Sequence, residues 1–153
     1  MKNMKLPDIK LLVPHAEPML LLDRVISVSD NMLSTEVTIR SDSLFCDELG
    51  VGSWVGIEYM AQTMGAYAGF HAIKLGQPVK IGFLVGTRRY ECSKPYFSIG
   101  SILTISARCI LESPNGLSAF ECAISEGNEI IATATINAFL PENVNNFLEL
   151  EDR

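Results

Sequence analysis

Hydrophobic and polar residues alternate along much of the second half of the chain. Between residues 101 and 112 every second residue is apolar from Leu103 to Cys109. This period of two predicts a strand with one buried face. The turn-forming segments SPNG (113–116) and EGN (126–128) separate it from two further predicted strands, residues 117–125 and 129–139. The pattern therefore predicts an antiparallel meander.

Shorter elements are predicted in the first half of the chain. Residues 7–13 open with Pro and Asp and carry apolar residues at helical spacing, which predicts a short helix that stops before Pro14. Two strands, residues 20–29 and 34–40, flank the turn SDN and predict a hairpin. A further strand is expected at residues 80–92. We predict a loop at residues 41–53.

The segment GIEYMAQTMGAYAGFHAI, residues 56–73, is apolar on all sides apart from a few positions. It predicts one long helix that Ser53 caps and that ends at Gly76, ahead of Pro78. A helix this apolar cannot face water, so the strands must cover it. The expected fold is α+β, with a long central helix wrapped by a curved antiparallel sheet of five to six strands.

Composition narrows the class of protein. The 153 residues are 48% hydrophobic, which predicts a single domain over 1–153, with a core at about 8–140 and an acidic tail at 141–153. Eighteen acidic residues outnumber twelve basic ones, so a nucleic-acid surface is not expected. The cysteines occur singly, without a C-x-x-C pair, and we expect reduced thiols and no metal site.

The expected location is the cytoplasm. The polar N-terminus MKNMKLPDIK lacks the apolar core of a signal peptide. The apolar run that starts at Ser53 is long enough for a membrane span, but polar residues such as Glu58, Gln62 and His71 interrupt it. We therefore expect a buried helix and no membrane span.

Three motifs resemble those of the hotdog 3-hydroxyacyl-(acyl carrier protein) dehydratases, in the same order. They are PHAEPMLLLDRVISV, IEYMAQTMG and RRYECSKPYFSIGSIL, within a resemblance that spans roughly residues 11–140. The chain looks closest to the ApeP-type dehydratases of aryl polyene biosynthesis. The resemblance implies a hotdog fold, a homodimer or a heterodimer with a related hotdog subunit, and an acyl tunnel between the two subunits. It also implies a substrate carried on the phosphopantetheine arm of acyl carrier protein, with no other cofactor and no metal.

Glu58 is the single carboxylate in the apolar helix. On a helix it shares a face with Trp54, Gln62 and small residues such as Gly65, which leaves room for a substrate chain. Burying an ionisable group without a partner is costly, so a reason for its presence is expected. The resemblance implies that Glu58 is catalytic, because it matches the acid of the family's EAMAQ motif. The alternative is an acid satisfied by a buried hydrogen bond.

The family's catalytic His is missing from this chain. It precedes the acid by fourteen residues, where this sequence has Leu44. His71 lies thirteen residues beyond Glu58, roughly 20 Å along the helix, and cannot work with Glu58 inside one subunit. His15, in the Pro-bracketed loop PHAEPM, is the remaining candidate base. Its alternative role is a hydrogen bond that fixes the loop.

Further contacts with substrate and carrier are expected. The start of the helix offers backbone N–H groups to a thioester carbonyl at Gly52 and Ser53. We also expect Trp54 and Gln62 to contact substrate. Candidate docking charges for acyl carrier protein are Arg88, Arg89 and Lys94, and the alternative for these three is a solvated strand face.

Three functions remain open. The preferred one is a dehydratase that makes trans-2-enoyl thioesters on acyl carrier protein, in aryl polyene or fatty acid biosynthesis, with His15 and Glu58 as its catalytic residues. The second is a hotdog acyl thioesterase, in which the same acid activates water. The third is a non-catalytic subunit that pairs with an active dehydratase homologue. Acyl chain length, and which group is acid and which is base, cannot be read from the residues.

Overall fold

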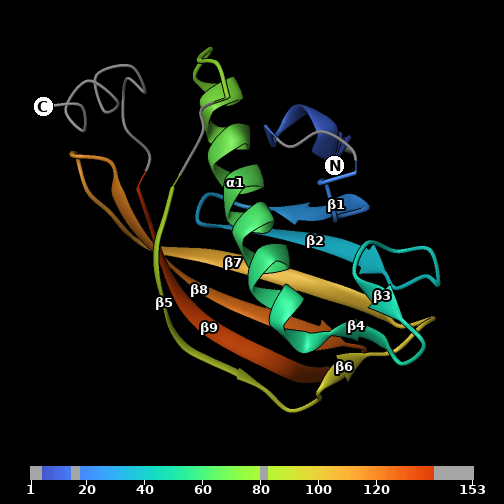
Figure 1. Cartoon of the computed structure of the whole chain (residues 1–153). Helices are drawn as coiled ribbons and strands as arrows, with labels where there is room; N and C mark the ends of the chain where they lie inside the picture. The colour runs from blue at the N-terminus through green and yellow to red at the C-terminus, as the bar shows by residue number, and fades with distance from the viewer. Residues whose placement is uncertain (1–4, 15–17, 80–82, 140–153) are drawn as a thin grey trace, which may run out of the picture.

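The computed structural model describes residues 5–14, 18–79 and 83–139. Six strands form one antiparallel sheet in the order β1-β2-β7-β8-β9-β5 (Figure 1). They are β1 (Arg24–Val28), β2 (Met32–Thr38), β5 (Phe83–Cys92), β7 (Ile102–Glu112), β8 (Leu117–Glu126) and β9 (Glu129–Phe139). The predicted hairpin and the predicted meander are both confirmed. The predicted acidic tail, residues 141–153, lies outside the described residues.

One helix, α1 (Gly56–Lys74), lies along the face of this curved sheet (Figure 1). Its buried side chains meet the inward side chains of β7, where Leu103, Ile105 and Ala107 have no exposed surface. The hydroxyls of Thr35 on β2 and Thr63 on α1 lie 2.8 Å apart in this contact. Pairing these two buried hydroxyls removes the cost of burying either alone. The predicted α+β arrangement, with a central helix against an antiparallel sheet of five to six strands, is confirmed, and the sheet has six.

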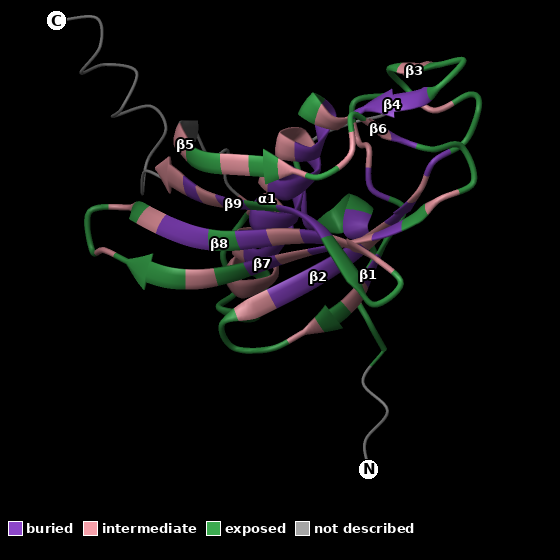
Figure 2. Cartoon of the chain, turned by 90° about the horizontal axis from the view of Figure 1, so that it is seen from below, coloured by how far each residue is buried: buried purple, intermediate pink, exposed green. Residues whose placement is uncertain are grey.

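Burial follows the predicted alternation. Figure 2 shows buried residues along β2 and β8, with exposed residues toward the ends of the hairpins. In β7 the buried positions are every second residue from Leu103 to Ala107. Because side chains in a strand point alternately to its two faces, this register places the apolar set against α1 and the polar set toward solvent.

The start of α1 differs from the prediction. A 3-10 turn, η2 (Ser53–Val55), precedes the helix, and neither element has a side-chain cap at its start. The predicted capping role of Ser53 is therefore wrong, because the residue lies inside the 3-10 turn. The end of α1 is as predicted: Gly76 has a φ of 71°, and its N–H and that of Gln77 bond back to the last turn.

Part of the loop predicted at residues 41–53 forms two strands of a second, small sheet. It has the order β3-β4-β6, formed by β3 (Cys46–Asp47), β4 (Gly50–Gly52) and β6 (Tyr96–Phe97). Gly50 has a φ of 122°, and a Cβ built on it would lie 2.1 Å from the Phe97 carbonyl oxygen. Only glycine fits this crossing of two backbones. The sheet holds the chain that leads into α1.

The N-terminal segment packs against α1 at Gly69. It contains a 3-10 turn, η1 (Ile9–Leu11), where the Asp8 carboxylate accepts a hydrogen bond from the Lys10 N–H. The helix predicted at residues 7–13 is thus reduced to this three-residue turn. The next residue, Leu12, is 1% exposed, and its carbonyl lies directly over Gly69 of α1. This close approach covers the surface of α1 at Gly69.

Candidate functional site

Glu58 lies in the first turn of α1 and is half-buried. Its carboxylate oxygen Oε1 accepts a hydrogen bond of 3.0 Å from the side-chain amide of Gln62, one helical turn further on. The spacing of four residues brings the two side chains to the same face of the helix. The carboxylate is therefore held in place by a neighbour on its own helix.

Gln62 is itself fixed by the backbone of the segment that leads into β1. Its Nε2 donates to the Met19 carbonyl at 2.8 Å, and its Oε1 accepts from the Leu21 N–H at 2.9 Å. Gln62 has no exposed surface, so these bonds satisfy a buried amide. Both amide hydrogens are used within the protein, and the contact of Gln62 with substrate stays a prediction. In the structure Gln62 links Glu58 to the 19–21 segment.

A groove with a volume of about 370 Å³ runs along α1 from Glu58. Small residues of the helix line it at intervals of three and four positions, namely Ala61, Gly65, Ala68 and Ala72. This spacing places them on one stripe of the helix surface. The predicted stripe of small residues beside Glu58 thus lines an open channel at Ala61 and Gly65, whereas Gly69 lies against the N-terminal segment.

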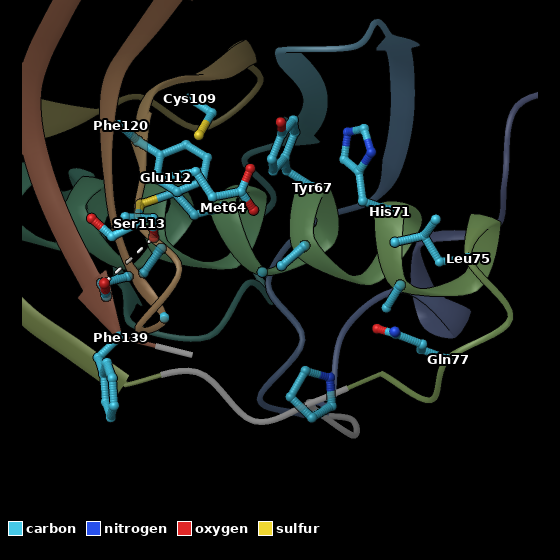
Figure 3. A pocket seen from close by; sticks show the side chains of 18 of the residues that line it. Met64, Tyr67, His71, Leu75, Gln77, Cys109, Glu112, Ser113, Phe120 and Phe139 are labelled. Atoms are coloured by element: carbon cyan, nitrogen blue, oxygen red, sulfur yellow. Dashed lines mark hydrogen bonds between the residues drawn. The ribbon is translucent and has the colours of Figure 1, made fainter. Parts of the chain in front are cut away.

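The facing wall of the groove comes from the strands. Phe120 of β8 supplies apolar surface near Met64 of α1, and the turn between β7 and β8 contributes Ser113 (Figure 3). The phenyl ring of Phe120 meets the Tyr67 ring edge to face, with centroids 5.3 Å apart. An apolar channel of this kind suits an extended acyl chain. This wall could not be predicted from the sequence, because the pairing of β7 with β8 decides which strand residues face α1.

The end of the groove farthest from Glu58 is formed by Tyr67, His71, Leu75 and Gln77. Figure 3 shows Tyr67 and His71 rising from α1 side by side, and their ring centroids are 4.4 Å apart. The Tyr67 hydroxyl donates to the Asp30 carbonyl at 3.0 Å, and burial raises the pKa of Tyr67 to about 12. Tyr67 is therefore a neutral, anchored part of the wall.

Of the two predicted catalytic residues, the structure describes only Glu58. Glu58 heads the groove, whereas His15 lies outside the part of the chain that the structure describes. Pro14, the residue before it, lines the groove that Glu58 heads. His71 stands thirteen residues further along the same helix, as expected. Leu44, at the position of the family's catalytic His, is partly exposed. The role of His15 stays a prediction.

The predicted thioester contact at Gly52 and Ser53 stays a prediction, and one of its two amides is already hydrogen-bonded within the protein. The Ser53 N–H donates to the Pro95 carbonyl at 3.0 Å, so this amide is not free for a substrate oxygen. The ring of Trp54 lies over Gly52, because a Cβ built on Gly52 would be 1.9 Å from a ring carbon. Trp54 is 64% exposed. The contact of Trp54 with substrate is untested and stays a prediction.

The three candidate docking cations differ in their surroundings. Arg88 and Arg89 are both exposed although they are adjacent in β5. A bulge between Arg88 and Glu91, at which Arg89 adopts a φ of 54°, explains this departure from alternation. The ammonium group of Lys94 lies 3.9 Å from the Glu126 carboxylate. Arg88 and Arg89 therefore present the denser positive charge, and docking itself stays a prediction.

Neither a metal cluster nor a membrane span is found in the described parts of the chain. No group of three His, Cys, Asp or Glu side chains there is arranged to hold a metal ion. Across the same residues, no helix combines the length and the hydropathy needed to cross a membrane. The four cysteines are free thiols, and burial raises the pKa of the Cys122 thiol to about 12.

Comparison with known proteins gives the family. A chain of the dehydratase heterocomplex ApeI:P from Xenorhabdus doucetiae superposes with a TM-score of 0.90 at 30% identity, covering 97% of this chain and 100% of that one. AziG from S. sahachiroi gives a TM-score of 0.63 at 14% identity, with 85% and 98% covered. A hypothetical thioesterase crystallised with coenzyme A from Streptococcus pneumoniae TIGR4 gives 0.60 at 14% identity, with 76% and 84% covered.

The two matches at 14% identity show the hotdog fold alone. None of the curated proteins compared with the chain matches it. The sequence matches the model of the ApeP-like family, described as ApeP dehydratase, over residues 7–149, which is nearly the whole chain. Together with the 30% identity to a chain of the ApeI:P complex, this match leads to one conclusion: the protein belongs to the ApeP-like dehydratase family.

Proposed function

We propose that this chain is a subunit of a dehydratase that converts 3-hydroxyacyl thioesters on acyl carrier protein into trans-2-enoyl thioesters, in aryl polyene biosynthesis. The observation that carries the proposal is the position of Glu58. This carboxylate is held by Gln62 at the head of an apolar groove of about 370 Å³. A chain that lies in the groove brings its thioester end to the carboxylate.

The chemistry needs an acid and a base. Removing water from a 3-hydroxyacyl thioester takes a proton from the carbon next to the carbonyl and gives a proton to the departing hydroxyl. In this proposal Glu58 carries out one of these transfers. Because Gln62 donates a hydrogen bond to Oε1, the carboxylate keeps one orientation through the proton transfer. Loss of the Gln62 amide then disturbs the reaction without removing the acid.

We propose that the working form is a complex with a related hotdog subunit. The support is the solved ApeI:P structure, a dehydratase heterocomplex that contains a chain 30% identical to this one. Exposed apolar side chains also gather on and beside the small sheet, namely Leu44, Phe45, Leu49 and Trp54. Such a surface is unfavourable in water and is typical of a protein contact. In the complex these side chains are covered.

The second proton-transfer group distinguishes two versions of the proposal. In the first, His15 replaces the family's loop histidine, and this chain carries both groups. In the second, Leu44 marks a subunit that lacks its own base, so that the chain supplies Glu58 and the groove and the related subunit supplies the base. The specific observation in favour of the second version is the apolar side chain at position 44.

We further propose that Arg88 and Arg89 guide acyl carrier protein to the groove. Carrier proteins present acidic surfaces, and two adjacent exposed guanidinium groups offer complementary charge. Lys94 contributes less, because Glu126 already compensates part of its charge. These charges affect the encounter with the carrier protein and leave the chemistry at Glu58 unchanged.

The experiment uses mass spectrometry of acyl carrier protein loaded with 3-hydroxyacyl chains. The chain is tested alone and together with the related hotdog subunit, in the wild type and as His15→Ala. Loss of one water with the wild-type chain alone, abolished by His15→Ala in a folded protein, supports the first version. Loss of one water only when both subunits are present, and unaffected by His15→Ala, supports the second. Release of free acid in place of enoyl thioester contradicts both.

A further inference from the structure

The first turn of α1 carries Glu58, and neither α1 nor the 3-10 turn before it has a side-chain cap at its start. The end of a helix frays unless other contacts hold it. One such contact comes from β5, whose last part curves below the start of α1 in Figure 1. There the hydroxyl of Tyr90 donates a hydrogen bond to the Ser53 carbonyl. A side chain from the large sheet therefore holds the backbone that leads into Glu58.

Tyr90 also fills the space next to Gly56, the first residue of α1. A Cβ built on Gly56 would collide with the Tyr90 hydroxyl, and it would lie 3.0 Å from a methyl group of Ile124 and 3.2 Å from the ring of Phe97. Glycine at this position thus lets the hydroxyl lie directly against the helix backbone. Burial raises the pKa of Tyr90 above its usual range, so the hydroxyl keeps its proton and stays a donor.

A bulge in β5 turns Tyr90 toward α1. The pairing of β5 with β9 shifts register between Arg88 and Glu91, where β5 has one residue more than β9. Arg88 is exposed, and without the extra residue position 90 would face the same way, because side chains two positions apart share a face of a strand. Arg89 takes up the extra length with a φ of 54°. A positive φ is unfavourable for a residue with a side chain, so the surrounding structure must hold this bulge in place.

We propose that Tyr90 is a positioning residue for dehydration, whose hydroxyl fixes the first turn of α1 and with it the place of the Glu58 carboxylate. The inference rests on the proposed function in taking Glu58 as a group that transfers a proton. Tyr90 acts through the helix backbone and transfers no proton itself. Gln62 holds the carboxylate from one turn further along, and Tyr90 holds the turn from the sheet. This matters because a displacement of about 1 Å in a catalytic group can lower a rate about a hundredfold.

The test compares Tyr90→Phe with the wild type, each in the complex with the related hotdog subunit and with 3-hydroxyacyl carrier protein as substrate. Tyr90→Phe keeps the ring and removes the hydroxyl. We expect kcat to fall about tenfold, as for a displacement of less than 1 Å, and KM for the carrier protein to stay the same because the groove and its charges are unchanged. Urea unfolding establishes the folded fraction. A purely structural role would leave kcat per folded molecule at the wild-type value.

Two further variants separate the hydroxyl from other effects. Gly56→Ala pushes the hydroxyl away from the Ser53 carbonyl, so it should also lower kcat, and adding Tyr90→Phe to it should lower kcat no further. Tyr96→Phe is the matched control. Tyr96 of β6 is half-buried near the same helix start, where its ring meets that of Trp54 edge to face with centroids 6.5 Å apart. Loss of its hydroxyl should leave kcat unchanged.

Three results would overturn the positioning role. They are equal kcat for the wild type and folded Tyr90→Phe, an equal loss in Tyr96→Phe, and a double variant in which Tyr90→Phe and Gly56→Ala each lower kcat by their full factor. In each case the wild-type complex still removes water, and the proposed function stands. A wild-type complex that removes no water from the carrier protein would contradict the proposed function and the positioning role together. The two failures are therefore distinguishable.

Discussion

Two glycines of α1, Gly65 and Gly69, lie one helical turn apart and should respond in opposite ways to the same substitution. A Cβ added at Gly69 would lie 1.9 Å from the carbonyl oxygen of Leu12, and the next nearest atoms are also backbone. A Cβ added at Gly65 would find only a methyl group of Val13, at 3.9 Å. Gly69→Ala therefore requires the N-terminal segment to move, whereas Gly65→Ala requires no movement.

The magnitudes follow from two opposing effects. Replacing glycine by alanine in a helix stabilises it by roughly 0.5–1 kcal/mol, and this gain applies at both positions. At Gly69 the Leu12 carbonyl must retreat by about 1.5 Å to reach ordinary contact, and overpacking of this kind costs about 1–3 kcal/mol or more. The shift also loosens the buried side chain of Leu12. We expect Gly65→Ala to stabilise the protein by up to about 1 kcal/mol and Gly69→Ala to destabilise it by about 2 kcal/mol.

Urea unfolding of the wild type and the two variants measures these differences, provided that the slope of free energy against urea stays the same. Gly65 also lines the groove, so its added methyl group should raise the KM for long acyl chains and leave short chains unaffected. A Gly69→Ala protein as stable as the wild type would refute the close packing of the N-terminal segment on α1. A Gly65→Ala protein that loses more than about 1 kcal/mol would refute the open space at that position.

Three further predictions follow from the site. Gln62→Ala leaves the Leu21 N–H and the Met19 carbonyl without their partner and should lower the free energy of unfolding by about 2–4 kcal/mol. Gln77 is an exposed residue of the groove, and Gln77→Ala should change this free energy little in the same urea titration. Replacing Arg88 and Arg89 by Glu should raise the KM for acyl carrier protein substrates but not for pantetheine thioesters; equal effects on both would exclude a docking role. Tyr67 has a pKa of about 12 in the folded state and near 10 when unfolded, so the unfolded state loses its proton first as pH rises. The free energy of unfolding should therefore fall between pH 10 and pH 12. A smaller fall for Tyr67→Phe than for the wild type would support this, and an equal fall would contradict it.

Long, regularly patterned elements could be predicted from the sequence. The alternation from Leu103 to Cys109 identified β7 because one face of that strand is buried from Leu103 to Ala107. Glycine at position 76, ahead of Pro78, identified the end of α1 because few other residues adopt a positive φ readily. The spacing of four between Glu58 and Gln62 likewise placed both on one face of the helix, and they form a hydrogen bond.

Features that depend on contacts distant in sequence could not be predicted in the same way. The strands β3, β4 and β6 have two or three residues each, too few for a visible period, and β6 follows β4 only after the whole of α1 and β5. The N–H of Ser53 was expected to be free because the sequence does not reveal that the Pro95 carbonyl lies beside it. The wall that Phe120 forms depends on strand register, which is set by the complete sheet.

The central claim is that the Glu58 carboxylate, held at the head of the groove, takes part in dehydration. Glu58→Gln is the most direct test, because it keeps the size and the hydrogen-bonding capacity of the side chain and removes the acid. The chain is assayed with its related hotdog subunit on 3-hydroxyacyl carrier protein, with mass spectrometry to follow the loss of one water, and with urea unfolding to establish that the variant is folded. We predict that folded Glu58→Gln loses at least a hundredfold in rate, the contribution typical of a general acid or base. An unchanged rate in a folded variant would contradict the account, and would leave the chain with a groove but without a role for its carboxylate.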